Sequence, residues 1–232
     1  MTAAGAKLKA TDRGANLGAK LPGMQLTERD LEILEFINTF GFCAMPQLEA
    51  RFGWSKPRNY QIVKRLLSAN LLIHEKILHA RHGIYRLTRK GAGYTELPAL
   101  SRITLSSYNH SLAVTDVYLY LRQKYPKAEW MSEREMVMDK YAAGLGKSGH
   151  LPDGILYLSS PGKKDQKIAV EVELRSKGKA RLESIIKWYT SQFDFAEVWY
   201  FCPQVVANAV KGSMGEQRSK FIKVFSLKEI AS

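Results

Sequence analysis

The N-terminal third of the chain opens with apolar residues at helical spacing. In LTERDLEILEFINTF the apolar positions recur every three or four residues, and Thr27 in front of them is a residue type that caps helices. The segment MPQLEARFGW predicts a second, short helix, with Pro46 near its first turn and Gly53 at its end. Two consecutive helices are therefore expected in this part of the chain.

The next segments predict a third helix and then a change of period. SKPRNYQIVKRLLSANLLI indicates a helix over about residues 57–69, stopped by Asn70, with these side chains facing inward: Tyr60, Val63, Leu66 and Leu67. LLIHEKIL and GIYRLT are short strand-like runs joined by a loop that contains Gly83. Three helices followed by a β-hairpin is the element order of a winged helix-turn-helix domain.

The second half alternates helices and strands. TRKGAGYTELPALSRITL is interrupted by glycine and proline and is expected to be a linker. The predicted elements after it are a helix from Ser106 or Ser107 to about Tyr125, strands at about 129–138, 153–159, 167–174 and 196–202, a helix over about 177–191, and a last strand in FIKVFSL. This pattern predicts an α/β (α+β) protein whose mixed sheet carries helices on both faces. The expected division is a basic arm (1–25), a winged-helix domain (26–90), a linker (91–105) and a sheet domain (106–232).

The charge of the chain indicates which kind of partner it binds. The 35 Lys and Arg residues exceed the 22 Asp and Glu residues, which gives a formal net charge of +13 and favours a nucleic-acid binder. Residues 51–90 hold ten Lys and Arg residues against one acid, Glu75, as a helix and wing that neutralise phosphates require. Winged helices also dock proteins, so a protein-binding recruiter stays open. The residues expected to contact double-stranded DNA are Lys56, Arg58, Asn59, Gln61, Lys64, Arg65, Arg81 and Arg86.

The cysteines and the apolar runs of the chain argue against a disulfide-stabilised, zinc-binding or membrane-spanning protein. Cys43 and Cys202 lie far apart and have no CxxC spacing, so neither a disulfide framework nor a zinc site is expected. No run of 18 apolar residues occurs, and the N-terminal stretch has no apolar segment of signal-peptide length. A cytoplasmic protein without a membrane partner is expected. The arm contains Lys7, Lys9, Arg13 and Lys20 and is expected to be a disordered tail, with phosphate contact as the alternative.

Two acidic segments in the second half carry candidate chemistry. HLPDGILYL places Asp153 at the start of an apolar run, and IAVEVELRSK interrupts the next run with Glu171 and Glu173. In a strand, residues i and i+2 point to the same face, so these two carboxylates are expected side by side. This arrangement is costly unless a positive charge lies between them.

The order helix, three strands, helix, strand, with PDG opening the second strand and EVE in the third, resembles the PD-(D/E)xK nuclease superfamily. The resemblance implies a divalent cation, Mg²⁺ or Mn²⁺, shared by Asp153 and Glu171 and used to hydrolyse a phosphodiester. The superfamily places a lysine two residues after the second acid, and Glu173 stands there instead. Either Glu173 is itself a metal ligand and a lysine from the following helix supplies the positive charge, with Lys177, Lys179 and Lys187 available, or catalysis has been lost.

A narrower resemblance rests on an ordered set of segments. LTERDLEILEFI, GIYRLTRKG, YNHSLAVTDVYLYL, HLPDGILYL and VEVELRSKGKARLESIIKWY are similar, in that order, to the replication-relaxation family of plasmid and mobile-element proteins. The resemblance implies binding at an origin of transfer or replication, with strand nicking by a metal-dependent relaxase. Other relaxosome or replication proteins are the further partners it implies. The alternative is a catalytically inactive regulator or accessory factor that uses the nuclease-like domain to form a homodimer.

Several polar residues near these segments have two interpretations. His110, on an amphipathic helix, is expected to be a partly buried histidine rather than a ligand, and His150 is either near the site or a loop residue. Glu133 and Glu135 alternate on the strand expected at 129–138, where a solvated face is the simpler interpretation for at least one of them. Tyr189 is expected in the core.

Overall fold

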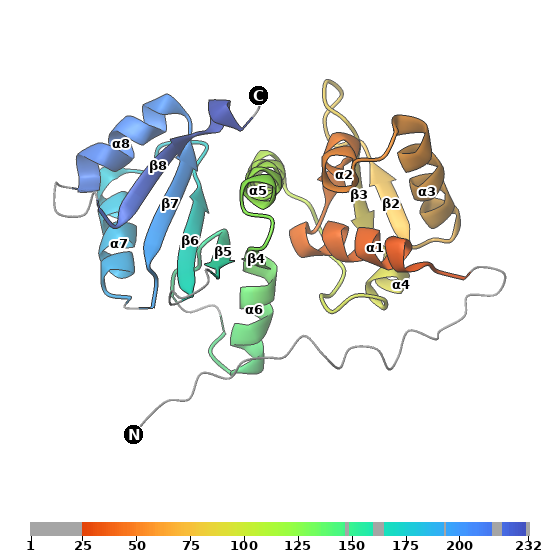
Figure 1. Ribbon diagram of the computed structural model, residues 1–232, viewed down its shortest axis with the longest axis horizontal. Helices are drawn as coiled ribbons and strands as arrows, with labels where there is room; N and C mark the ends of the chain where they lie inside the picture. The colour runs from red at the N-terminus through yellow and green to blue at the C-terminus, as the bar shows by residue number, and fades with distance from the viewer. Residues whose placement is uncertain (1–24, 147–148, 160–164, 193, 215–219, 231–232) are drawn as a thin grey trace.

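The chain is a mixed α/β protein. The computed structural model describes residues 25–146, 149–159, 165–192, 194–214 and 220–230 (Figure 1), so the predicted basic arm lies outside the described residues except for its last position. The elements of the N-terminal part (residues 25–104) are α1 (Glu28–Phe40), β1 (Cys43–Ala44), α2 (Met45–Phe52), α3 (Lys56–Ser68), β2 (Leu72–Glu75), β3 (Ile84–Leu87) and α4 (Arg89–Ala92). The strands form an antiparallel sheet in the order β1, β3, β2.

Local signals in the sequence fix these helices where they were predicted. Thr27 and Asp30 cap α1 reciprocally, because the Thr27 side chain accepts from the Asp30 N–H and the Asp30 carboxylate accepts from the Thr27 N–H. Gly53 ends α2 with a φ of 66°, a left-handed conformation that glycine adopts without strain. The inward face predicted for α3 is wrong at Tyr60, which is 56% exposed, and Ile62 is buried instead.

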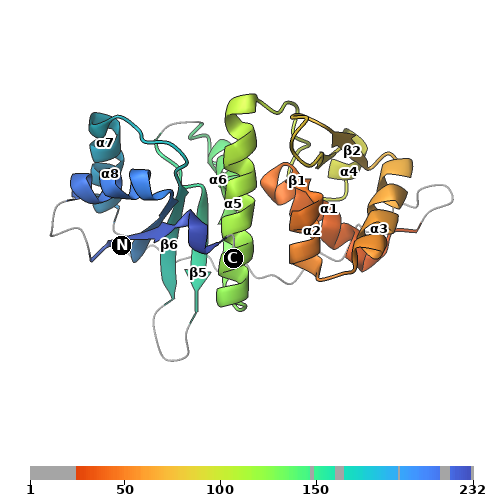
Figure 2. The same ribbon diagram turned by 90° about the horizontal axis from the view of Figure 1, so that it is seen from above.

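The C-terminal part (residues 105–230) is built around a five-stranded sheet. Its elements are α5 (Leu105–Lys124), β4 (Glu129–Ser132), α6 (Glu133–Ala142), β5 (Gly154–Leu158), β6 (Gln166–Val172), α7 (Lys179–Thr190), β7 (Glu197–Cys202), α8 (Gln204–Met214), β8 (Ile222–Ser226) and a 3₁₀ turn, η2 (Leu227–Glu229). The strand order is β4 to β8, with β4, β5 and β6 antiparallel and β6, β7 and β8 parallel. Helices α7 and α8 lie on one face and α5 on the other (Figures 1 and 2).

The strand expected at 129–138 is wrong beyond Ser132, where the chain turns into α6. The Ser132 side chain accepts from the Glu135 N–H, and the Glu135 carboxylate accepts from the Ser132 N–H at 2.6 Å, which completes a capping box. Glu133 and Glu135 therefore lie in the first turn of a helix, where acids favour the positive end of the helix dipole. Helix α8 was not predicted, and α7 begins at Lys179 rather than at 177.

One hydrophobic core runs through both parts of the chain. Its buried members include Leu34 of α1 and Leu66 of α3, Val117 of α5, and Val170 of β6. A polar contact also crosses this boundary, where Gln47 of α2, which is 5% exposed, donates to Asp116 of α5 at 2.7 Å. The predicted linker begins within α4 and contains a buried Leu97, and α5 lies between the two parts (Figure 2).

Gly154 in β5 leaves room for an indole ring. A Cβ added there would lie 2.0 Å from Cζ2 of Trp130, which packs against the strand from β4. We expect Gly154→Ala to lower the free energy of unfolding by about 1–3 kcal/mol, because the ring must shift inside a packed core. Urea denaturation measures this change. Gly212→Ala in α8, where an added Cβ meets nothing within 4 Å, is the control and should be neutral or stabilising.

Candidate active site

The predicted acids meet at one edge of the five-stranded sheet. Asp153 lies directly before β5, and Glu171 is the penultimate residue of β6. Because β5 and β6 are antiparallel, with Gly154 opposite Val170, the start of one strand adjoins the end of the other. Glu173 follows β6 and still donates its backbone N–H to the carbonyl of Phe201 in β7 at 3.0 Å. The topology thus places the three predicted acids at or next to adjoining ends of β5 and β6.

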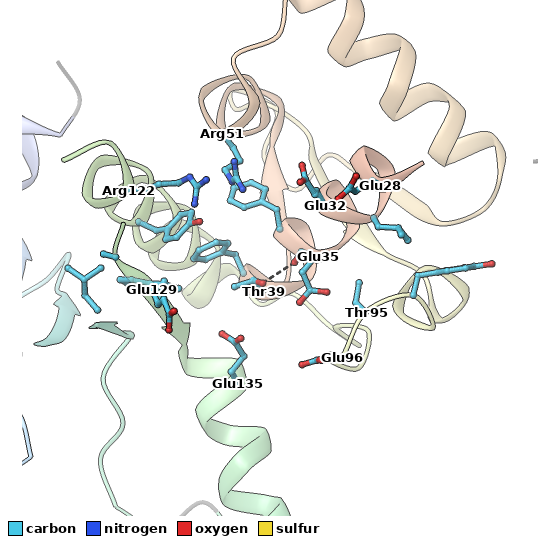
Figure 3. Close-up of a pocket in the computed structure, with 18 of the residues that line it drawn as sticks. Glu28, Glu32, Glu35, Thr39, Arg51, Thr95, Glu96, Arg122, Glu129 and Glu135 are labelled. Carbon is cyan, nitrogen blue, oxygen red and sulfur yellow. Dashed lines mark hydrogen bonds between the residues drawn. The ribbon is translucent and has the colours of Figure 1, made fainter. Parts of the chain in front are cut away.

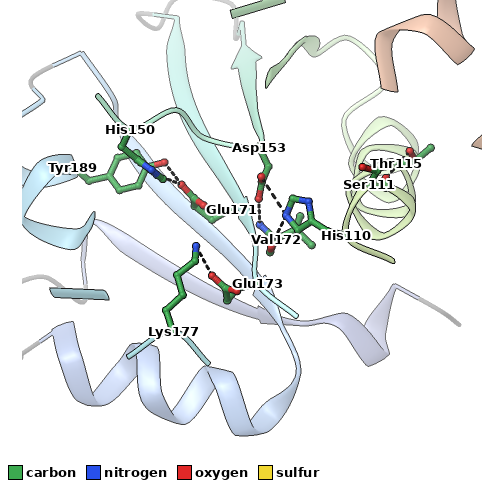
Figure 4. Close-up of polar contacts among 10 residues, drawn as sticks. All are labelled: His110, Ser111, Thr115, His150, Asp153, Glu171, Val172, Glu173, Lys177 and Tyr189. Carbon is green, nitrogen blue, oxygen red and sulfur yellow. Dashed lines mark hydrogen bonds and ion pairs between the residues drawn. The ribbon is translucent and has the colours of Figure 1, made fainter. Parts of the chain in front are cut away.

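Asp153 is held by the backbone of β6 and by a histidine. Its Oδ2 accepts from the Val172 N–H at 2.7 Å, and its Oδ1 lies 3.2 Å from Nε2 of His110 on α5 (Figure 4). The same Nε2 is 3.0 Å from the Val172 carbonyl oxygen. The hydrogen bond with Asp153 raises the pKa of His110 to about 9, although burial acts in the opposite direction. His110 is thus a cation at neutral pH and neutralises Asp153.

Glu171 is a buried carboxylate with two donors on one oxygen. It is 4% exposed, and its Oε1 lies 2.6 Å from Nε2 of His150 while also accepting from the hydroxyl of Tyr189 on α7. Burial raises the pKa of Glu171, and the charge of Asp153 adds to the rise, while His150 and Tyr189 act against it. The ring of His150 is fixed edge-on against Trp188 and Tyr189, with centroids 5.3 and 5.4 Å away.

Glu173 pairs with the lysine that follows the strand. Nζ of Lys177 lies 2.5 Å from Oε2 of Glu173, and Lys177 stands in the loop before α7 rather than on the helix (Figure 4). Lys187 is exposed on α7, and no described contact joins it to the acids. Lys179 pairs instead with Glu183 at 3.9 Å. Of the three lysines considered from the sequence, Lys177 is the one brought to the acidic edge.

Two further groups border the acids. Tyr200 of β7 stands opposite Glu171 in the parallel register and is 1% exposed, and its hydroxyl has no hydrogen-bond partner among the described residues. Burial raises its pKa, as do the charges of Glu171, Glu173 and Asp153. Glu133 at the start of α6 donates its backbone N–H to the Asp153 carbonyl at 3.3 Å, and burial together with Asp153 raises its pKa.

The acids are paired with basic groups of the chain itself. His110, His150 and Lys177 each contact a different one of the three carboxylates. Within the described ranges, no group of three or more His, Cys, Asp or Glu side chains is gathered closely enough to hold a metal. The Tyr200 hydroxyl has no partner among the described residues, and a water or a ligand oxygen could accept its hydrogen bond. The carboxylate oxygens of the three acids are of the type that a hard divalent cation binds.

The predicted DNA-contacting residues divide into two groups. Exposed side chains on α3 and in the β2–β3 loop are Lys56, Arg58, Gln61, Lys64 and Arg81. Asn59 needs a correction, because it is 2% exposed and its amide donates to the Trp54 carbonyl at 3.0 Å, so it does not face solvent. Arg65 is paired with buried Asp30, and Arg86 with Glu75 at 2.5 Å, so both have structural partners.

Sequence reasoning missed parts of this site. His110 and Tyr189 were expected as partly buried or core residues, and both contact a predicted catalytic acid. Tyr200 was not singled out, although pairing β6 with β7 in parallel would have placed it beside Glu171. On α3, exposed Tyr60 lies among the basic residues and was placed in the core.

Comparison with models of known protein families finds no match to this chain, and a search of curated proteins finds none either. Among the described residues, no helix has the length and apolar character needed to span a membrane.

Proposed function

We propose that this protein binds duplex DNA and nicks one strand by metal-dependent hydrolysis. The observation that carries the proposal is the convergence of Asp153, from a Pro-Asp-Gly segment, and buried Glu171 at one sheet edge. A PD-(D/E)xK nuclease core has the order helix, three strands, helix, strand. The same order occurs here in α5, β4, β5, β6, α7 and β7, with α6 inserted after β4. This supports the resemblance to the replication-relaxation family and the cleavage of a plasmid or mobile-element origin.

Asp153, Glu171 and Glu173 are the residues that would hold Mg²⁺ or Mn²⁺. A bound cation would lower the pKa of a water and stabilise charge on the phosphate. His150 and Tyr189 hold the Glu171 carboxylate in place through Oε1, as groups around metal ligands generally do. Lys177 keeps a positive charge at Glu173, where the superfamily places its lysine, and is the group we assign to orient the nucleophile or the phosphate.

The N-terminal part supplies the DNA-binding surface in this proposal. Helices α1, α2 and α3 followed by the β2–β3 hairpin have the order of a winged helix. Helix α3 carries exposed Lys56, Arg58 and Lys64, and the hairpin loop carries exposed Arg81. Such side chains neutralise phosphates and release counterions. Exposed Tyr60 adds a hydroxyl and a ring on the same helix, next to Gln61.

A nicking assay tests the catalytic half of the proposal. Supercoiled plasmid carrying the DNA that flanks this gene is incubated with protein and Mg²⁺ or Mn²⁺, and nicked circles are counted. We expect Glu171→Gln to lower the rate by about 10²–10³-fold, because the isosteric amide keeps the shape and removes the charge. Glu183→Gln on α7 is the control, since the Glu183 side chain is half exposed and pairs with exposed Lys179. Cleavage by Glu171→Gln at the wild-type rate would contradict the assignment.

The competing function is a DNA-binding regulator without catalysis. It is favoured by the pairing of each acid with His110, His150 or Lys177 and by the absence of a gathered metal-binding group in the described ranges. Titration calorimetry with Mn²⁺ separates the two functions. Heat that disappears in Glu171→Gln supports the nickase. No detectable binding to wild-type protein, together with no nicking, would leave the regulator as the function.

A further inference from the structure

A groove with acidic walls lies between the two parts of the chain. It has a cavity volume of about 1140 Å³ and runs between α1, the end of α5, β4 and the start of α6 (Figure 3). Its acidic lining residues are Glu28, Glu32, Glu35, Glu96, Glu129 and Glu135. Aromatic side chains lie between them, with Tyr118 of α5 and Trp130 of β4 packed edge to face at 5.5 Å. The groove belongs neither to the candidate active site nor to the basic surface of α3.

The acids concentrate negative charge in a protein with a formal charge of +13. Three basic residues, Arg51, Lys90 and Arg122, also line the groove, so acids outnumber bases there. Glu28 and Glu32 are four residues apart on α1, a spacing at which like charges repel. Both are exposed. Mutual repulsion and an aromatic lining favour a ligand with several positive charges.

We propose that residues 1–24 of the same chain dock in this groove. The segment contains four basic residues, Lys7, Lys9, Arg13 and Lys20, and one acid, Asp12. Its charge is therefore complementary to that of the groove. It also leads directly into α1, whose first residue, Glu28, already lines the groove. A segment of 24 residues can extend by up to about 80 Å, which is ample for reaching the β4 wall.

Covalent attachment favours this segment over a basic peptide from another protein. A tethered ligand faces its site at an effective concentration of about millimolar, so a partner in solution must exceed that concentration or bind more tightly. The side-chain chemistry also fits. The alkyl stems of Lys and Arg cover apolar surface while their charged ends reach carboxylates, and their cations are attracted to the faces of rings such as Tyr118 and Trp130.

Zero-length cross-linking of the full chain tests the proposal. A carbodiimide joins a lysine amine to a carboxylate only where the two are in contact, and mass spectrometry locates the joined peptides. We expect cross-links from Lys7, Lys9 or Lys20 to groove glutamates such as Glu32 and Glu129. In an equal mixture of ¹⁴N- and ¹⁵N-labelled chains, these cross-links should join peptides of the same label. Mixed-label pairs would show that a second copy occupies the groove and would overturn the intramolecular proposal.

Trypsin cleavage after the arm lysines gives a second readout in the same protein. We expect cleavage at Lys7, Lys9 and Lys20 to be at least about 10-fold faster in Glu28→Gln/Glu32→Gln/Glu129→Gln than in wild type, because the counter-charge is removed. About 1 M salt should speed wild-type cleavage similarly, since it screens exposed charges. Glu183→Gln, an exposed acid on α7, should leave the rate unchanged. Wild-type cleavage as fast as that of a free 1–24 peptide, or cross-links spread over acids outside the groove, would refute the docking.

Discussion

Charge reversal at Arg58 and Lys64 is expected to remove duplex-DNA binding. Both side chains are exposed on α3, and each reversal replaces a phosphate-neutralising cation with an anion that repels the backbone. We expect the Arg58→Glu/Lys64→Glu variant to lose at least about 100-fold in affinity at about 100 mM salt, with a shallower dependence of log affinity on log salt concentration. Fluorescence anisotropy with a labelled duplex measures both quantities.

The matched control changes the net charge equally in another place. Lys211→Glu/Lys220→Glu alters two exposed lysines on and after α8, so the total charge falls by the same four units as in the α3 variant. If this control weakens binding as much as the α3 variant does, net charge rather than the α3 surface determines affinity. Unchanged affinity in the α3 variant would place the DNA on a different surface.

Removing the Asp30 carboxylate is expected to destabilise the N-terminal part strongly. Asp30 is fully buried, accepts from the backbone and hydroxyl of Thr27, and pairs with Arg65 of α3. Asp30→Ala breaks the cap of α1 and leaves Arg65 without its partner. We expect the free energy of unfolding to fall by about 2–4 kcal/mol, measured by urea denaturation. Glu32→Ala, an exposed acid on the same helix, should change it by less than about 0.5 kcal/mol.

The same carboxylate predicts a pH dependence with a defined sign. Burial opposes ionisation of Asp30, but the hydrogen bonds from Thr27 and the pair with Arg65 outweigh it and hold its pKa below the ordinary value of 3.8. A lowered pKa stabilises the fold above the unfolded-state value, and this contribution is lost as the pH falls through the folded-state pKa. The stability difference between wild type and Asp30→Ala should therefore shrink below about pH 4. A difference that stays constant down to pH 2 would contradict the pairing.

The sequence predicted the elements whose local signals are strong. Thr27 and Gly53 bound helices where expected, because caps act within one turn and need no tertiary partner. The same kind of signal was overlooked at Ser132, where the capping box with Glu135 starts α6 in a run whose apolar pattern also fits a strand. Capping chemistry within one turn determines the start of the helix in both cases, even where the periodicity of the run also fits a strand.

The environment of the acids could be predicted only in part. The two-residue spacing of Glu171 and Glu173 predicted a common face, but their contact partners are not visible in that spacing. His110 reaches Asp153 from α5, and His150 reaches Glu171 from the loop before β5, so both contacts depend on tertiary packing. The burial of Asn59 was likewise not predicted from the sequence. Its side-chain amide donates to the Trp54 carbonyl, so it does not lie on the exposed polar face of α3.

Helix α5 connects the candidate active site to the N-terminal part of the chain. It carries His110, in contact with Asp153, and six residues later Asp116, in contact with Gln47 of α2. Six residues of α-helix span about 9 Å, and hydrogen bonds within the helix make that segment stiff. If α3 reads a sequence and the acidic edge cuts a phosphate, the offset between the two along the duplex is a constant of the protein. The chain would then act as a ruler, with every nick at one set number of base pairs from the sequence that α3 binds.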